Sequence, residues 1–409
     1  MSQRSLYIGV DLRDENSQLA LLVPQGEEPK LVFDPRDKTE NTQIPTVVTI
    51  PGSKETIGHF LEKIVKGEPI FATGVETDPV NVLAAYFQKI LSFTRREYPE
   101  GMIRRLVVTT KYRDFRFISQ IYQALEKLGI GKDRAMVVDR RQCFVYYVMN
   151  QKKDLWVNQV GLFDYEDHEI TYFQMHVDRN QHPPFVSVME KTYPDYVKML
   201  EEPVPEENGE SGENARGSVV EAMVKGALHG QVITTVYMTG KGFTDGFADD
   251  IMTQLCVGRH VFRGNNLYVF GACFIAREYS GERKMEPFLY MDEDTIPVNI
   301  TMQAYTNAKA QEIMLAKAGT PWYQVDYEVD LISDGEDELQ IRVYHVRDKS
   351  AHTHILPMDG IQGRLDRKAR IGLQIRFAGV DKCIFTIRDK GFGSFFPSSH
   401  RIWEETIIV

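Results

Sequence analysis

Two distant segments of the chain share one pattern, an apolar strand that ends in an aspartate and leads through a turn into a second strand. The first covers residues 5–23 around Gly9-Val10-Asp11, and the second covers residues 160–177 around Gly161-Leu162-Phe163-Asp164. Apolar and polar residues alternate around the first turn, and the second segment repeats the order of strand, turn and strand, which predicts two β-hairpins. Their similarity indicates two lobes built on one plan.

Helical and strand patterns alternate after each hairpin, which is typical of the α/β class. Behind the first hairpin, residues 106–110 read as a buried strand, 115–128 as a helix ending near Gly129, and 135–138 as a further strand. The other elements expected are a strand-like segment at 44–51, helices at 57–65, 80–93, 218–228, 245–255 and 265–277, and a strand at 233–238. The acidic run at 201–217 lacks apolar periodicity and is predicted to be a loop.

The character of the chain changes near residue 287, where alternating strands replace the helical patterns. Strands are expected at residues 325–331, 339–345, 371–377 and 383–388, with turns at Ser333-Asp334-Gly335 and Asp389-Lys390-Gly391. This part is predicted to be an all-β sandwich. The predicted domains are therefore residues 1–157, residues 158–283 and residues 284–409.

Composition narrows the class of protein. At 409 residues, with 43% hydrophobic and 26% charged side chains, the chain resembles a globular protein of more than one domain. A net charge of -10 disfavours nucleic acid as a partner. The four cysteines are scattered without CxxC spacing, which favours buried, reduced thiols. No membrane-spanning segment or secretory signal is recognisable, so we expect no membrane partner and a cytoplasmic location.

Short motifs along the chain occur in a recognisable order. They are Tyr7-Ile8-Gly9-Val10-Asp11-Leu12, Ile44-Pro45-Thr46-Val47-Val48, Val107-Val108-Thr109-Thr110, Val137-Val138-Asp139, Met238-Thr239-Gly240-Lys241-Gly242, Phe270-Gly271-Ala272, Met358-Asp359-Gly360-Ile361 and Phe385-Thr386-Ile387-Arg388-Asp389-Lys390-Gly391. In this order they resemble the DnaK-like, seventy-kilodalton heat-shock chaperones along nearly the whole chain. The resemblance implies a two-lobed, actin-like ATPase fold of the ribonuclease H-like type, followed by a peptide-binding β-sandwich without the family's helical lid.

The same resemblance implies a set of site residues. Asp11, Asp139 and Asp164 fall where the family organises magnesium-bound water, as vestigial catalytic groups or metal ligands. The glycines at 240, 242 and 271 fall in the adenosine loop and the second connecting helix, as cofactor-binding positions. A plainer interpretation is open for each, because aspartates also end strands and cap turns, and a Gly-x-Gly is also a tight turn.

The phosphate loops depart from the family's pattern. Gly-Thr-Thr in the first loop is replaced by Arg13-Asp14-Glu15, and the glycines and threonine of the second by Glu166-Asp167-His168-Glu169. The lysine position holds Glu62, beside Lys63, and the adenine-stacking arginine position holds Thr244. A carboxylate about 5 Å from a phosphate costs on the order of 3 kcal/mol at an effective dielectric near 20. We therefore expect weak or absent binding of ATP or ADP with Mg²⁺.

These features favour a chaperone-like pseudo-ATPase, not an enzyme, that binds a polypeptide or protein partner through its β-domain. One alternative is an active ATP-dependent chaperone that uses extra divalent metal, and a second is another actin-fold enzyme such as a sugar kinase. Phe395-Phe396-Pro397 and Trp403 are candidates for contact with a peptide or for core packing.

Overall fold

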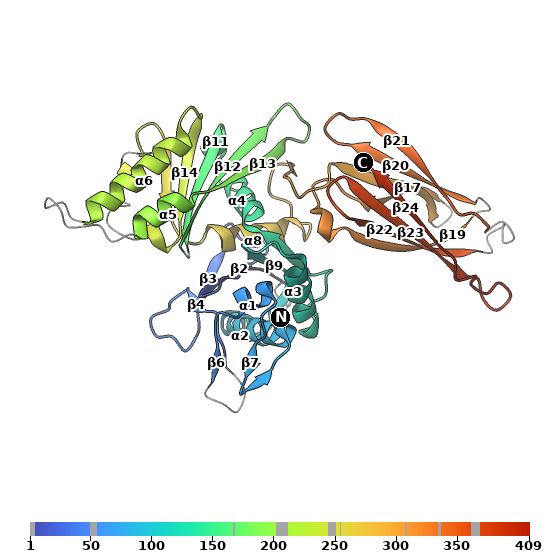
Figure 1. Ribbon diagram of the computed structural model, residues 1–409, viewed down its shortest axis with the longest axis horizontal. Helices are drawn as coiled ribbons and strands as arrows, with labels where there is room; N and C mark the ends of the chain where they lie inside the picture. Colours follow the sequence, from blue (N-terminus) through green and yellow to red (C-terminus); the bar gives the residue numbers. More distant parts are fainter. Residues whose placement is uncertain are drawn as a thin grey trace. The chain divides into compact units, whose positions relative to one another are not determined.

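The computed structural model describes residues 5–49, 55–166, 168–201, 212–243, 251–253, 255–306, 309–333, 337–360 and 369–409. The chain divides into two compact units (Figure 1). Unit 1 consists of Met1–Val177 and Val188–Glu286, and unit 2 of Asp178–Ser187 and Pro287–Val409. Unit 1 mixes helices with sheets, as the α/β prediction requires, and within unit 1 we call residues 5–156 lobe I and residues 159–177 with 188–278 lobe II.

The sheet of lobe I is built around the first predicted hairpin. Its strand order is β10-β9-β1-β2-β3, with β4 also paired to β2. Strands β1 and β2 are antiparallel, whereas β9 and β10 continue the sheet parallel to β1. The bounds are β1 Ser5–Asp11, β2 Asn16–Leu22, β3 Lys30–Val32, β4 Ile44–Pro45, β9 Met102–Thr110 and β10 Ala135–Asp139.

The sheet of lobe II repeats this plan, with the order β15-β14-β11-β12-β13-β16. Strands β11 and β12 form the second hairpin, and β14 and β15 lie parallel to β11. The bounds are β11 Gln159–Glu166, β12 Glu169–Asp178, β13 Phe185–Thr192, β14 Ile233–Thr239, β15 His260–Arg263 and β16 Leu289–Tyr290. β16 pairs with the first residues of β13, which belong to unit 2.

Two helices, α4 and α8, pack together in the middle of unit 1, between the two sheets (Figure 1). α8 lies on β1 and β9, and α4 reaches the other sheet through Phe144, whose ring packs edge-on against Tyr237 of β14. Gly271 of α8 lets the two helices approach closely, because a Cβ at this position would lie 2.1 Å from the Cys143 carbonyl oxygen of α4. The bounds are α1 Phe60–Lys66, α2 Pro79–Glu97, α3 Phe115–Lys127, α4 Arg140–Met149, η1 Lys153–Trp156, α5 Pro194–Glu201, α6 Gly212–Leu228, η2 Lys241–Phe243 and α8 Leu267–Glu278.

Outer elements complete both lobes. α5 and α6 bury Val197, Met223 and Val224 against the apolar side chains of the lobe II sheet. Lobe I carries two small two-stranded sheets, formed by β5 Val48–Thr49 with β6 Thr56–Ile57 and by β7 Phe71–Ala72 with β8 Val75–Glu76. Among the helices of the described residues, none has both the length and the apolar character that a bilayer crossing requires.

Unit 2 is a sandwich of two four-stranded antiparallel sheets, with the orders β18-β17-β20-β21 and β19-β22-β23-β24. Both sheets contribute to one core, in which Ile300, Ile341, Leu373 and Phe385 are fully buried. The bounds are β17 Val298–Thr306, β18 Lys309–Ala316, η3 Trp322–Gln324, β19 Asp326–Ile332, β20 Glu338–His345, β21 Ala351–Pro357, β22 Arg370–Phe377, β23 Lys382–Gly391 and β24 Ile402–Ile408.

Two expectations about local structure need correction, and one helix was missed. The helix expected at 57–65 begins only at Phe60, because Ile57 pairs with Val48 in the β5–β6 sheet. The segment 201–217 is not all loop, since α6 already begins at Gly212. Helix α4 was not predicted, although it lies at the centre of unit 1. Thr244, Asp167 and most of the helix expected at 245–255 lie outside the described residues, as do parts of the turn expected at 333–335 and of the motif at 358–361.

Candidate functional site

Asp11 and Asp164 occupy corresponding places in the two repeated sheets. Asp11 is the last residue of β1 and pairs with Thr109 of the parallel strand β9. Asp164 lies in β11 and pairs with Thr239 of the parallel strand β14. Both carboxylates are buried, with 0% and 4% of the side chain exposed. The duplicated plan therefore places one buried acid in each lobe.

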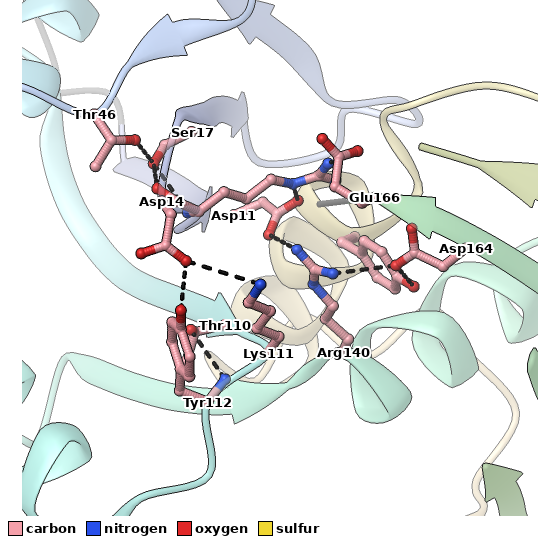
Figure 2. A network of polar contacts seen from close by, with 12 residues as sticks. Asp11, Asp14, Ser17, Thr46, Thr110, Lys111, Tyr112, Arg140, Asp164 and Glu166 are labelled. Atoms are coloured by element: carbon pink, nitrogen blue, oxygen red, sulfur yellow. Dashed lines mark hydrogen bonds and ion pairs between the residues drawn. The ribbon is translucent and has the colours of Figure 1, made fainter. Parts of the chain in front are cut away.

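Arg140, the first residue of α4, lies between these two acids (Figure 2). Its Nη1 donates to Asp164 Oδ2 at 3.1 Å, and its Nη2 lies 3.9 Å from Asp11 Oδ1. The guanidinium also stacks 5.0 Å from the ring centre of Tyr268, whose hydroxyl donates to Asp164 Oδ2 at 2.8 Å. Burial alone would lower the pKa of Arg140, but Asp11 and Asp164 outweigh it and raise the pKa. Burial raises the pKa of Tyr268 well above its usual value, so that hydroxyl remains a donor.

Arg13 is a second buried cation in the same cleft. Its Nε donates to Asp11 Oδ2 at 2.6 Å, and its Nη1 donates to Glu166 Oε2 at 2.8 Å, so one side chain joins both lobes. Burial would lower the pKa of Arg13, and the neighbouring carboxylates, Asp11 foremost, raise it instead. At the rim, Lys241 extends its Nζ to Glu15 Oε2 at 2.7 Å while its backbone N–H donates to Glu166 at 3.2 Å.

The remaining residues of the first altered loop also have protein partners. Asp14 Oδ1 accepts a hydrogen bond from the Glu62 backbone at 3.0 Å, and its Oδ2 accepts one from the Tyr112 hydroxyl and lies 3.9 Å from Lys111 Nζ. The Glu62 side chain is half exposed and pairs with Lys66 at 2.6 Å on its own helix. The Asp14 carboxylate is therefore integrated into the fold of lobe I.

Asp139 does not join Asp11 and Asp164 around Arg140. It is the N-cap of α4, where it accepts the Gln142 backbone N–H at 2.9 Å, and it pairs with Arg141 at 2.7 Å. This is the capping role that the plainer interpretation gave it. Within the described residues, no three His, Cys, Asp or Glu side chains are grouped as a metal site would require.

The predicted cofactor-binding glycines pack against protein atoms. A Cβ on Gly240 would lie 2.2 Å from the Tyr165 carbonyl oxygen, and one on Gly242 would lie 2.0 Å from the Tyr165 ring. Gly240 also has a φ of 100°, which L side chains rarely adopt. Gly271 admits the close crossing of α4 and α8 described above. Packing thus accounts for all three glycines without a ligand.

A cavity of about 390 Å³ opens beside this network. Its charged lining is mixed, with five basic and six acidic side chains from both lobes, several of them already paired. These residues are Lys66, Lys111, Arg113, Arg140 and Arg141, with Glu62, Asp139, Asp164, Glu166, Glu169 and Glu190. Arg113 of lobe I pairs across the cleft with Glu190 of β13.

The sequence indicated Asp11, Asp164 and Glu166, together with Arg13, as residues of this cleft. It did not indicate that Arg140, Tyr268 and Lys241 are their partners. The sequence contains one indication of where Arg140 lies. This residue directly follows Asp139, the last residue of β10, and β10 runs parallel to β1 in the same sheet. Residues at the carboxyl ends of neighbouring parallel strands meet at one edge of a sheet. No comparable signal marks Tyr268, which follows a strand in the other lobe.

Comparison with known proteins places the chain in a family. Residues 39–293, more than half of the chain, match the model described as a family of unknown function, DUF5716 C-terminal. The chain belongs to the DUF5716 family. Residues 295–409 of this family member match a domain of unknown function, DUF8552, which covers most of unit 2. A search of curated proteins finds no match.

Proposed function

We propose that this DUF5716 protein is a DnaK-like, chaperone-type protein that binds a polypeptide or protein partner through unit 2, while unit 1 is a scaffold with no working ATPase. The observation that carries the proposal is the pair of buried guanidinium groups, Arg13 and Arg140, among Asp11, Asp164 and Glu166. In the resembling chaperones this is where phosphates and Mg²⁺ are expected.

The residues present do not fit a magnesium nucleotide. A divalent cation needs several oxygen ligands at about 2.0–2.6 Å, yet Asp11 and Asp164 have a guanidinium between them. A phosphate cradle needs inward-facing backbone N–H groups, which glycines allow. Here the Arg13 side chain, 5% exposed, lies between Asp11 and Glu166 instead. No catalytic step through ATP or Mg²⁺ follows from this arrangement.

The architecture supports an actin-type fold as part of the proposal. Two sheets repeat one strand order, each with an antiparallel hairpin and two further parallel strands. In each lobe the first strand carries a buried aspartate. Helices α4 and α8 follow the last parallel strands of the two sheets and cross between them. A two-lobed fold of the ribonuclease H-like type has this duplicated form.

Unit 2 offers an exposed apolar anchor for a partner. Phe395, in the loop between β23 and β24, is 90% exposed, whereas Trp403 packs against the sandwich core and donates its indole N–H to the Asp359 carbonyl at 3.2 Å. The loop is held in place by Asp389, which accepts hydrogen bonds from the backbone of Gly391 and Ser399. An exposed aromatic side chain on a hydrogen-bonded loop is a favourable contact for a partner.

Titration calorimetry with Mg-ATP tests the loss of the ATPase. We expect binding no tighter than about millimolar, equivalent to roughly 4 kcal/mol. Micromolar affinity that weakens when Asp11 is changed to alanine would refute the proposal, because it would show a live nucleotide site.

Fluorescence anisotropy with a labelled apolar heptapeptide tests the partner-binding role of unit 2. We expect saturable binding that Phe395→Ala weakens by about tenfold, in line with the loss of one aromatic anchor. The matched control is Phe71→Ala in unit 1, another exposed phenylalanine at 55%, which should leave binding unchanged. Equal effects of the two variants would exclude the loop as the binding surface.

A further inference from the structure

The ion pairs of the cleft cross from one lobe of unit 1 to the other. Arg13 of lobe I holds Glu166 of lobe II at 2.8 Å, and Arg140 holds Asp164 at 3.1 Å. At the rim, Lys241 holds Glu15 at 2.7 Å. The first two pairs are buried, whereas the Lys241–Glu15 pair is about half exposed.

The charges buried between the two lobes explain why Arg13 is needed for the lobes to close. Asp11, Asp164 and Glu166 form a buried cluster of three negative charges, and Arg140 supplies one positive charge. Without Arg13, closed lobes would hold two uncompensated carboxylates away from water, which is strongly unfavourable. With Arg13 the cluster retains one net negative charge, and Lys241 lies 3.7 Å from Glu166. No external cation is then needed for the lobes to close.

We propose that Arg13 is a tethered counter-ion that keeps the two lobes of unit 1 closed in the absence of any ligand. This inference deepens the proposed function, since it states what replaces the nucleotide in a scaffold without ATPase activity. Unit 1 then has one resting conformation, and its lobes do not open and close with ATP.

Pulsed electron resonance between two spin labels measures the lobe separation in the full chain. Suitable label sites are Glu126→Cys in α3 and Lys198→Cys in α5, both exposed, with the exposed Cys256 replaced by serine. In the ligand-free protein we expect a single narrow distance distribution that Mg-ATP does not change. A broad distribution, or one that narrows with a ligand, would overturn the inference without any cleft variant.

Arg13→Met then tests the counter-ion itself. It should raise the population of open lobes by about tenfold or more, because the closed state now holds unpaired carboxylates. Adding Asp11→Asn and Glu166→Gln to Arg13→Met should restore the narrow distribution, a rescue that a purely steric role of Arg13 does not predict. The control is Arg36→Met, which removes an exposed pair with Asp34 and should change nothing. A distribution in Arg13→Met equal to that of the unaltered protein would refute the proposal.

The two proposals fail separately. If Mg-ATP binds tightly but the ligand-free lobes are already closed, the scaffold function is wrong and the counter-ion stands. If ATP does not bind but the ligand-free lobes are open, the counter-ion proposal is wrong and the scaffold function stands.

Discussion

Replacing Arg140 by alanine tests how strongly the buried network stabilises unit 1. The guanidinium attracts Asp164 at 3.1 Å and Asp11 at 3.9 Å. At an effective dielectric near 20 these attractions are about 5 and about 4 kcal/mol. Desolvation offsets part of this in the intact protein, but removing Arg140 leaves the Asp164 carboxylate buried without its cation, while Asp11 keeps Arg13. The expected cost is therefore about 3–5 kcal/mol of the free energy of unfolding.

Urea unfolding of the full chain, followed by fluorescence and circular dichroism, measures this loss in the transition of unit 1. Asp164→Asn combined with Arg140→Ala should recover much of the loss, because the unpaired charge is then gone. Arg36→Ala is the matched control, since Arg36 is 75% exposed in its pair with Asp34 and should cost less than about 1 kcal/mol. A loss for Arg140→Ala no larger than for this control would refute the reasoning.

The same variant should acquire a response to magnesium. With Arg140 gone, Asp164 loses its guanidinium partner while Asp11 keeps Arg13, so a divalent cation can take the place of the Arg140 guanidinium beside Asp164. For a dissociation constant of about 1 mM, 10 mM Mg²⁺ would add about 1.4 kcal/mol of stability. The unaltered protein should gain nothing. Equal responses of both proteins would contradict the view that Arg140 occupies a cation position.

Three further predictions concern other parts of the chain. Gly271→Ala should lower the free energy of unfolding by about 1–3 kcal/mol or more in thermal melts, because its Cβ would lie 2.1 Å from a carbonyl of α4. Gly226→Ala in α6 is the control, since nothing lies within 4 Å of its Cβ, and it should be neutral or stabilising. Ellman's reagent should modify Cys256 quickly and the three buried cysteines only after unfolding, since burial raises the pKa of those thiols. Rapid reaction of more than one thiol would contradict this prediction. Asp389→Ala should lower the stability of unit 2 by about 2–4 kcal/mol, because its carboxylate accepts three hydrogen bonds from the following turn; an unchanged urea midpoint would show that the turn needs no such support.

Much of the local structure follows from the sequence, because burial on one side leaves a periodic pattern. Helix α3 buries one face, as the spacing of its apolar residues predicts, and the apolar strands of the two hairpins around Asp11 and Asp164 are buried almost throughout. In unit 2, strand β20 alternates buried and exposed residues around Ile341 and Val343. The substitutions at Arg13 and Glu166 were also visible, since they stand where glycines were expected.

Other features depend on residues that only folding brings together. Helix α4 is buried on nearly every side, so its sequence has no polar face and no helical period of apolar residues. Arg140 at its start was therefore not predicted as a site residue. Arg13 and Glu166 are 153 positions apart in the chain, and their pairing follows from the way the repeated sheets face each other. The sequence determined that the segments after the two buried aspartates carry charges of both signs, with Arg13, Asp14 and Glu15 in one and Glu166 in the other. Only the tertiary structure decided that these charges neutralise one another, because an ion pair depends on separation in space and on burial, neither of which a one-dimensional pattern records.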